Sequence, residues 1–176
     1  MRAALGALDG PFDLIFVATG ALDGAGRPPE KTLKSLDPAA MAAQFAVNCI
    51  GSAMVLKHAV CLLPRDRRAV FAALSARVGS IGDNGLGGWY SYRAAKAALN
   101  QIVHSGAIEL SRSHPRSICV ALHPGTVATE FTADYAARHS TVSPPHAARH
   151  LLSVIEGLEA SDTGGFLDWK GDVVPW

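Results

Sequence analysis

The sequence predicts an α/β fold in which a parallel sheet is covered by helices on both faces. Short apolar runs, rich in β-branched and aromatic residues, alternate along the chain with longer segments of helical periodicity. The apolar runs are nearly continuous, which is typical of strands that are buried on both sides of a parallel sheet. With 176 residues, 49% hydrophobic and 18% charged, the chain is expected to form a single domain over residues 1–176.

Four segments carry the strand pattern. The first is FDLIFVA at 12–18, and the second is RAVFAALS at 68–75, which runs into the glycine-rich loop VGSIGDNGLGG at 78–88. The third, SICVALHPG at 117–125, ends in a Pro-Gly loop, and the last is the short GGFLDWKG at 164–171. Because long helical segments separate the strands, parallel pairing is expected.

Three segments carry the helical pattern. The segment 37–63 has Asp37 as its candidate N-cap and Pro38 at the first helical position. A second helix is expected across 90–113, directly after the glycine-rich loop, and a third across 143–158, with two prolines near its start. The first residues, MRAALGALDG, resemble the tail of a helix that feeds the first strand.

Composition argues against several classes of partner. The net charge is +1 without a basic block, so no nucleic-acid partner is expected. No uninterrupted apolar run reaches the roughly 18–20 residues that span a bilayer, and no signal peptide is visible, so a cytoplasmic protein without a membrane partner is expected. The chain has three cysteines, Cys49, Cys61 and Cys119. Because their number is odd and they are widely spaced, they are predicted to be reduced core thiols. His146 and His150 form an i, i+4 pair without a Glu or Cys nearby, so no metal site is expected.

The stretch TGALDGAG at 19–26 matches the TGxxxGxG loop that binds a dinucleotide phosphate. Such a loop works because a helix begins directly behind its glycines and points its N-terminal amides at the phosphate. Here the glycines are followed by RPPEKTLKSLD, in which two consecutive prolines and an aperiodic charged run preclude that helix. The match is therefore predicted to be fortuitous.

The stronger chemical signal is SYRAAKAALN, in which Tyr92 and Lys96 share one face of a helix. An ammonium group beside a phenol favours the phenolate, so Lys96 is expected to lower the pKa of Tyr92 and suit it to proton transfer. The alternative is a tyrosine stacked over a lysine stem on a solvated face. Context favours the first interpretation, because the pair follows a glycine-rich loop at a strand end, where open α/β sheets bind ligands.

Four motifs together resemble the classical short-chain dehydrogenases/reductases. VATG at 17–20 is similar to the NNAG turn of that family, and VNCIG at 47–51 to its helix motif with a catalytic asparagine. YSYRAAK at 90–96 and PGTVAT at 124–129 resemble its tyrosine-lysine motif and its PG-x-x-x-T cofactor segment. The likeness covers nearly the whole chain and looks strongest to the branch of C-factor signalling proteins and sniffer-type carbonyl reductases.

The resemblance implies an NAD(P)-dependent oxidoreductase with a Rossmann-like fold that transfers hydride between a nicotinamide and a carbonyl or alcohol substrate. It implies that Tyr92 exchanges a proton with the substrate, that Lys96 binds ribose hydroxyls, and that Asn48 holds a water molecule. NAD and NADP are both open as the cofactor. The implied cofactor-binding residues are Ala18, Thr19, Gly20, Tyr92, Lys96, Pro124, Gly125, Val127 and Thr129.

The substrate-orienting serine of the family has no clear counterpart. Sixteen residues before Tyr92, where the resemblance places it, stands Ala76. Ser75 and Ser80 could each supply the hydroxyl, with Ser80 favoured, although either serine could equally cap a glycine-rich loop. The GSIG around Ser80 lacks the first glycine of a nucleophile elbow, which argues against a hydrolase.

The resemblance also implies that the first βαβ units would lie upstream of Met1, leaving about four strands of a truncated sheet and an exposed apolar edge at 12–18. Activity is then expected to be lost or weakened if the chain is the whole molecule. A mis-assigned start codon, a proteolytic product and a genuine short form are all open. The alternative function is a non-catalytic dimerising or signalling module, a homo-dimer or homo-tetramer formed through the helices at 37–63 and 93–103. The substrate is not readable from the loop at 128–145.

Overall fold

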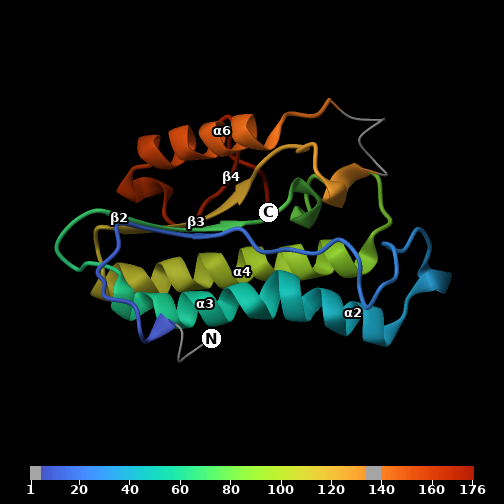
Figure 1. Ribbon diagram of the computed structural model, residues 1–176, viewed down its shortest axis with the longest axis horizontal. Helices are drawn as coiled ribbons and strands as arrows, with labels where there is room; N and C mark the ends of the chain where they lie inside the picture. Colours follow the sequence, from blue (N-terminus) through green and yellow to red (C-terminus); the bar gives the residue numbers. More distant parts are fainter. Residues whose placement is uncertain (1–4, 134–139) are drawn as a thin grey trace.

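The strands form one parallel sheet in the order β1-β2-β3-β4 (Figure 1). A computed structural model describes residues 5–133 and 140–176 of the chain. The strands are β1 (Leu14–Val17), β2 (Ala69–Leu74), β3 (Ser117–His123) and β4 (Phe166–Asp168). All four lie within the predicted segments, and their parallel pairing confirms the fold class that the sequence predicts.

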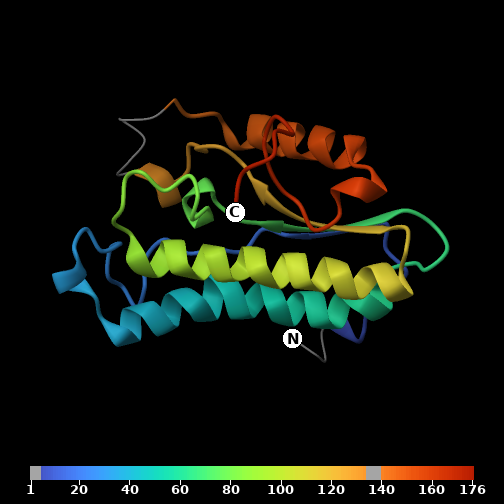
Figure 2. The same ribbon diagram turned by 180° about the vertical axis from the view of Figure 1, so that it is seen from behind.

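Helices cover both faces of this sheet, as predicted (Figures 1 and 2). On one face, a continuous helical rod lies beside the long helix α4, and on the other face lies α6. The rod consists of α2 (Pro38–Phe45), a π-helical turn (Ala46–Gly51), α3 (Ser52–Ala59) and a final 3-10 turn (Val60–Leu62). The other two helices are α4 (Tyr90–Ser113) and α6 (Pro144–Gly157).

Alternate side chains of the central strands separate two cores. In β2, Phe71 and Ala73 are buried against α3 and α4, whereas Val70 and Ala72 are buried against α6. Because successive strand residues point to opposite faces, this alternation of wholly apolar residues requires helices on both sides. The sheet is thereby a rigid platform whose strand ends are fixed in position.

Local signals set the start of the first helix. The Asp37 carboxylate accepts a hydrogen bond from the Ala40 amide at 2.9 Å, and Pro38 occupies the first helical position, as predicted. By contrast, no helix begins directly behind Gly26: a 3-10 turn at Leu33–Ser35 is followed by α2. The structure therefore confirms that TGALDGAG is not backed by the helix that a phosphate loop requires.

The strand β1 forms an edge of the sheet, with β2 as its strand neighbour among the described residues. Leu14 and Phe16 are each 38% exposed, so the predicted apolar edge is present. The predicted helix tail at 1–10 lies partly outside the described residues.

One expectation from composition was wrong in part, and a second, the absence of a membrane partner, stays a prediction beside one further structural finding. Within the described residues, the helical stretch Pro38–Leu62 is long and apolar enough to cross a membrane, with a mean hydropathy of 1.6 over its most apolar window. Counting uninterrupted runs missed it, because Gln44 and Asn48 interrupt the run without making its average polar. The three cysteines are free, but Cys61 is exposed and not a core thiol, since it lies in the last turn of the rod with its Sγ 3.2 Å from the His58 carbonyl oxygen.

Candidate active site

The carboxyl ends of β1, β2 and β3 open into one cavity of about 390 Å³. This volume falls within the roughly 300–1,000 Å³ of small-molecule sites. Small residues follow each strand there, so the cavity wall is largely backbone and apolar side chain. Of the residues predicted from the sequence, those that line it are Ala18, Thr19, Gly20, Tyr92, Lys96, Pro124, Gly125, Val127 and Thr129.

The helix α4 brings Tyr92 and Lys96 into this cavity together. Tyr92 lies in the first turn of the helix and is 6% exposed, and Lys96 lies one turn later and is 3% exposed. The Lys96 Nζ lies 5.8 Å from the centre of the Tyr92 ring and donates a hydrogen bond to the Leu74 carbonyl at 2.8 Å. The interpretation of the pair as a solvated surface stack is therefore wrong, because both side chains are buried at the strand ends.

Burial shifts the pKa of both groups away from the expectation. Desolvation raises the pKa of the Tyr92 phenol well above its ordinary value. Desolvation also lowers the pKa of Lys96 to about 8, although the nearby Cys49 thiol opposes this shift. The expected lowering of the tyrosine pKa by the ammonium group is therefore wrong in direction, because the loss of water around the buried phenol governs its pKa.

The shifted pKa of Lys96 predicts a pH dependence of stability. Between its folded pKa of about 8 and its ordinary value of 10.5, the folded chain binds fewer protons than the unfolded chain. The free energy of unfolding should therefore rise with pH in this window, by about 2 kcal/mol between pH 7 and pH 10. Urea unfolding at several pH values, compared with Lys96→Met, measures this contribution. Parallel curves for parent and variant would contradict it.

Asn48 lies behind the cavity and joins the helical rod to the turn after β1. Its side chain is fully buried, accepts a hydrogen bond from the Ala21 amide at 3.1 Å and donates to the Ala21 carbonyl at 2.7 Å. A Cβ added at Gly20 would lie 3.2 Å from Asn48 Oδ1 and 3.7 Å from Lys96 Nζ, so the three residues converge. The π-helical turn that carries Asn48 is of a kind that is frequent at functional sites.

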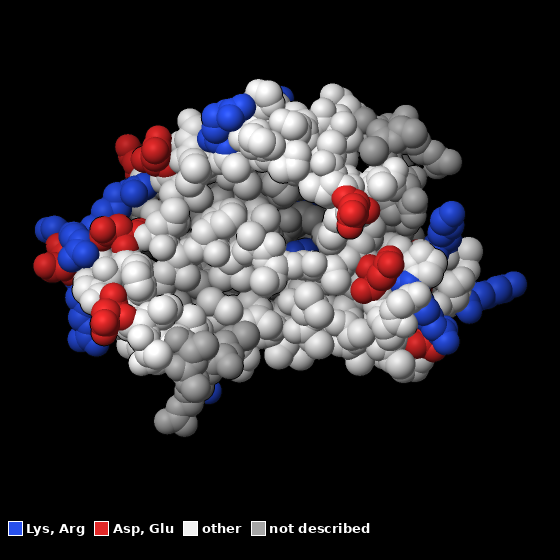
Figure 3. Space-filling view, in the orientation of Figure 1, with Lys and Arg blue, Asp and Glu red and all other residues white. Residues whose placement is uncertain are grey.

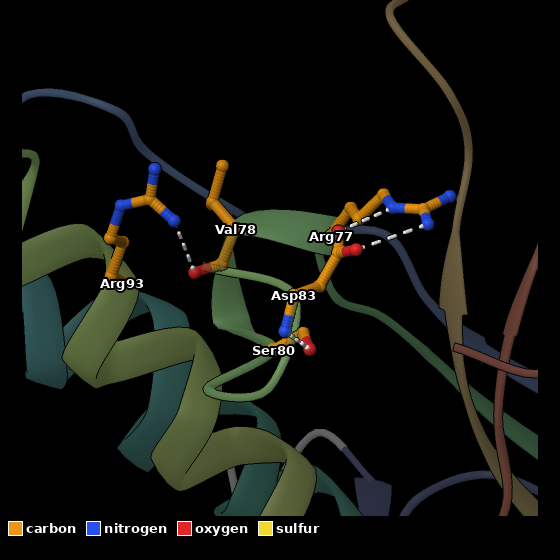
Figure 4. Close-up of polar contacts among 5 residues, drawn as sticks. All are labelled: Arg77, Val78, Ser80, Asp83 and Arg93. Carbon is orange, nitrogen blue, oxygen red and sulfur yellow. Dashed lines mark hydrogen bonds and ion pairs between the residues drawn. The ribbon is translucent and has the colours of Figure 1, made fainter. Parts of the chain in front are cut away.

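The structure separates the three positions considered for the substrate-orienting hydroxyl. Ser75 and Ala76 line the cavity, and the Ser75 hydroxyl donates to Asn100 Oδ1 at 2.6 Å. The favoured Ser80 is not among the cavity residues. It is 1% exposed, and its Oγ accepts the Asp83 amide at 3.0 Å (Figure 4). Its geometry is that of a residue that caps a turn.

The loop after β2 is fixed to α4. Arg93 reaches across from α4 and donates to the Val78 carbonyl at 3.2 Å, while Arg77 and Asp83 form an ion pair at 2.6 Å (Figure 4). A Cβ added at Gly79 would lie only 2.8 Å from the Lys96 Cβ and 2.9 Å from its carbonyl carbon, so the loop backbone rests directly on the helix. This contact helps to hold the Lys96 stem in place.

The segment after β3 provides the opposite wall. Gly125 has a φ of +77°, and a Cβ there would lie 3.0 Å from the Trp169 ring, so the turn requires glycine. The Val127 carbonyl accepts a hydrogen bond from the Thr132 hydroxyl, and Thr129 caps the turn that follows. Residues 134–139 of the predicted substrate loop lie outside the described part of the chain.

Several cavity residues were missed by the sequence reasoning. His123 is the last residue of β3, and its place just before the Pro-Gly turn could have identified it. Burial lowers its pKa to about 4, so the imidazole is neutral near pH 7. The Phe131 ring lies 6.2 Å from the Tyr92 ring. Phe16, Leu74, Thr132 and the α6 residues Pro144, Ala147, Ala148 and Leu151 complete the lining, through tertiary packing that no local motif encodes.

The surface agrees with a mainly apolar site. In the view of Figure 3, charged side chains gather mostly toward the two ends of the molecule, and basic atoms show in a hollow near the middle. Acidic side chains lie to the right of the hollow in this view, and the surface to its left is uncharged. A ligand there is expected to make mostly apolar and backbone contacts.

Comparisons with known proteins identify relatives of the chain. A family model described as enoyl-(acyl carrier protein) reductase matches residues 3–164. The chain is 36% identical over 148 residues to C-signal of Myxococcus xanthus, covering 82% of this chain and 83% of C-signal. It is 34% identical over 142 residues to 1-hydroxy-2-glutathionyl-2-methyl-3-butene dehydrogenase of Rhodococcus sp. (strain AD45), covering 81% of this chain but only 61% of that dehydrogenase.

Solved structures share the fold. Carbonyl reductase Sniffer of D. melanogaster superposes with a TM-score of 0.85 at 24% identity, covering 99% of this chain and 73% of Sniffer. A putative short-chain dehydrogenase/reductase from Burkholderia multivorans with bound NADP gives a TM-score of 0.82 at 26% identity, covering 99% of this chain and 72% of that one. The chain thus spans about three quarters of the length of these solved relatives.

Proposed function

The chain belongs to the short-chain dehydrogenase/reductase family, and from this premise we propose that it is an NAD(P)-dependent oxidoreductase acting on a carbonyl or alcohol substrate, with Tyr92 as the acid/base. One observation carries the proposal: Tyr92 and Lys96 are buried together in the wall of a cavity formed by three strand ends. Ligands bind at this edge of open α/β sheets.

The residues of the cavity fit the nicotinamide-ribose end of such a cofactor. Lys96 offers a donor for ribose hydroxyls, and the turns at Gly20 and Gly125 are free of side chains, so a planar ring can approach the backbone. Thr19, Val127 and Thr129 offer hydroxyl and main-chain groups to a carboxamide. The nicotinamide, when bound, supplies or accepts the hydride. NADP is the first candidate, since the Burkholderia relative holds it.

The remaining chemistry falls to the chain itself. A phenol with a raised pKa stays protonated at neutral pH, so Tyr92 carries the proton that the reduction of a carbonyl requires, while the raised pKa makes it a weaker acid than an unburied phenol. Lys96, with a pKa of about 8, gains and loses a proton near neutral pH and can return one toward the phenol. The apolar side chains of the cavity, Phe16, Leu74 and Phe131 among them, favour a small substrate with an apolar body.

Two experiments on the full chain test this proposal. The first titrates the chain with NADPH and with NADH and measures binding by nucleotide fluorescence. The second measures NADPH oxidation with a panel of small aldehydes and ketones. Saturable binding that weakens in Lys96→Met, together with carbonyl-dependent oxidation, is the expected result. Binding that is unchanged in Lys96→Met would place the nucleotide elsewhere. The absence of both binding and oxidation would overturn the proposed activity of this chain.

An exposed apolar face supports a second function, a homo-oligomeric interaction module. Val47, Ile50 and Met54 are 41%, 53% and 38% exposed and recur at helical spacing along the rod. Ile102 and Ile108 of α4, which covers the same face of the sheet, are 37% and 50% exposed. Clustered exposed apolar side chains mark interaction surfaces. We propose that a second copy of the chain covers this apolar surface.

Ile50→Lys tests the proposed contact between copies. A buried lysine without a partner is strongly unfavourable at an interface, so we expect the dissociation constant between copies to rise at least tenfold in the variant. Light scattering coupled to size exclusion, over a range of concentrations, measures this change. Leu86→Lys, at an exposed loop position, is the control. Equal association of all three proteins would contradict the assignment of this face.

A further inference from the structure

The first turn of α4 is held by a carboxylate from a distant part of the chain. Glu30, in the segment between β1 and α2, is only 7% exposed. Its Oε2 accepts the Ser91 amide at 3.2 Å, and its Oε1 accepts the Ser91 hydroxyl. Its main-chain oxygen also accepts the Trp89 amide, at 2.5 Å. Figures 1 and 2 both show the segment after β1 beside this end of α4.

The helix has no cap of its own. Trp89, at the N-cap position, lies in the left-handed region with a φ of 52° and makes no side-chain capping bond, and the first turn contains no acidic residue. The first amides of a helix otherwise need a side-chain or water partner, and a negative charge is favourable at this end. Glu30, which is 61 residues from Ser91 in the sequence, therefore supplies the capping acceptor and the negative charge that the local sequence lacks.

The ionised state of Glu30 suits this role. Burial by itself would raise the pKa of its carboxyl group, but hydrogen bonds from the Ser91 hydroxyl, from the main chain of Glu30 and from the Ser91 amide outweigh that effect and lower it. The carboxylate is thus charged at neutral pH, and Pro28 and Pro29 restrict the backbone that presents it. Glu30 and Tyr92 also line a second, small cavity of about 20 Å³, so the two residues lie close together.

Tyr92 and Lys96 depend on this contact to different degrees. Tyr92 follows Ser91 directly and belongs to the first turn, the part of a helix that frays most readily. Lys96 lies one turn further on, where its amine is fixed to the Leu74 carbonyl and its stem rests on the loop at Gly79. Loss of the cap would therefore move the phenol relative to the amine.

We propose that Glu30 is a positioning residue for the active site. By capping the first turn of α4, Glu30 holds the Tyr92 phenol in its position relative to the Lys96 amine. The role of Tyr92 as acid/base rests on the function proposed above, whereas the capping contact and its effect on the position of Tyr92 do not. The position of the phenol can be tested without turnover, which separates the two claims.

The test compares the full-length parent with Glu30→Ala, Glu30→Gln and Asp37→Ala. Asp37→Ala is the matched control, because it removes a carboxylate cap of the same kind from α2. In Glu30→Ala, amide hydrogen exchange at Ser91 and Arg93, which flank Tyr92, should accelerate about tenfold, while exchange at Leu99 and Val103 stays unchanged. Glu30→Gln keeps one acceptor oxygen and should show a smaller increase.

A second readout follows the phenol itself. Carbon-13 NMR of ring-labelled tyrosine at neutral pH, assigned with Tyr92→Phe, should show a changed chemical shift of the Tyr92 ring in Glu30→Ala, because the freed turn moves the phenol and admits water. Asp37→Ala should leave this chemical shift unchanged. Unchanged exchange and chemical shift in Glu30→Ala, or equal changes in Asp37→Ala, would overturn the proposal. If both readouts change as expected in a chain without carbonyl turnover, the positioning role holds and the proposed activity fails.

Discussion

Tyr92→Phe should reduce NADPH-dependent carbonyl reduction by about 10²- to 10⁴-fold, the usual contribution of a positioned general acid. The substitution removes the only proton donor of this side chain and keeps its ring. The ring contacts with Trp89 and Phe131, each at 6.2 Å, remain available, so the fold should be unaffected. Steady-state kinetics on the best carbonyl substrate measure the loss.

Two controls make this result specific. Circular dichroism and urea unfolding of Tyr92→Phe should match the parent, and its affinity for NADPH should change by less than about threefold, which corresponds to well under 1 kcal/mol. The substitution Tyr90→Phe, two residues earlier in the same turn, should keep full activity. If Tyr92→Phe retained more than a tenth of the parent activity, another group would have to donate the proton.

Ala76→Ser is expected to increase the same activity. Ala76 and Tyr92 line the same cavity, so a hydroxyl at position 76 can donate to the substrate oxygen on which negative charge develops. Single donors of this kind contribute about 10²- to 10³-fold in enzymes that evolved with them, and a newly introduced one should provide about tenfold in kcat/KM. Kinetics of the variant with a carbonyl substrate measure the gain.

Ser75→Ala and Ser80→Ala complete this comparison. The Ser75 hydroxyl is committed to Asn100 at 2.6 Å and that of Ser80 to the Asp83 amide at 3.0 Å, so neither alanine variant should lower kcat/KM by more than about threefold through lost substrate contact. A large loss in Ser75→Ala, with no gain in Ala76→Ser, would identify Ser75 as the orienting hydroxyl. A large loss of kcat/KM in Ser80→Ala would identify Ser80, the residue that the sequence favoured, as the orienting hydroxyl.

The secondary structure could be predicted because its signals are local. The apolar runs of the strands, Asp37 and Pro38 at the start of the first helix, and the prolines in the first turn of α6 each act over a few residues. The same locality exposed the false phosphate loop, since Pro28 and Pro29 preclude a helix wherever the segment lies. Motifs at strand ends also predicted which residues meet, because parallel strands end at the same edge.

Properties that depend on tertiary packing could not be predicted. The pKa of Tyr92 was expected to fall, because the sequence places a lysine nearby but does not report how much water burial removes. Glu30 was passed over as part of a charged, aperiodic run, since its partner Ser91 lies far along the chain. The α6 residues of the cavity could not be predicted either, because the sequence pattern of a helix indicates which face is apolar but not what that face contacts.

The close packing of Gly79 on the backbone of Lys96 fixes one position of the loop after β2, whereas two later positions are open to solvent. A side chain at residue 79 has no room, whereas Ile81 and Leu86, a few residues later, are 78% and 90% exposed. Substitutions at Ile81 and Leu86 can therefore accumulate while the lysine stays where it is. A library that randomises this loop should vary these two positions and keep position 79 invariant.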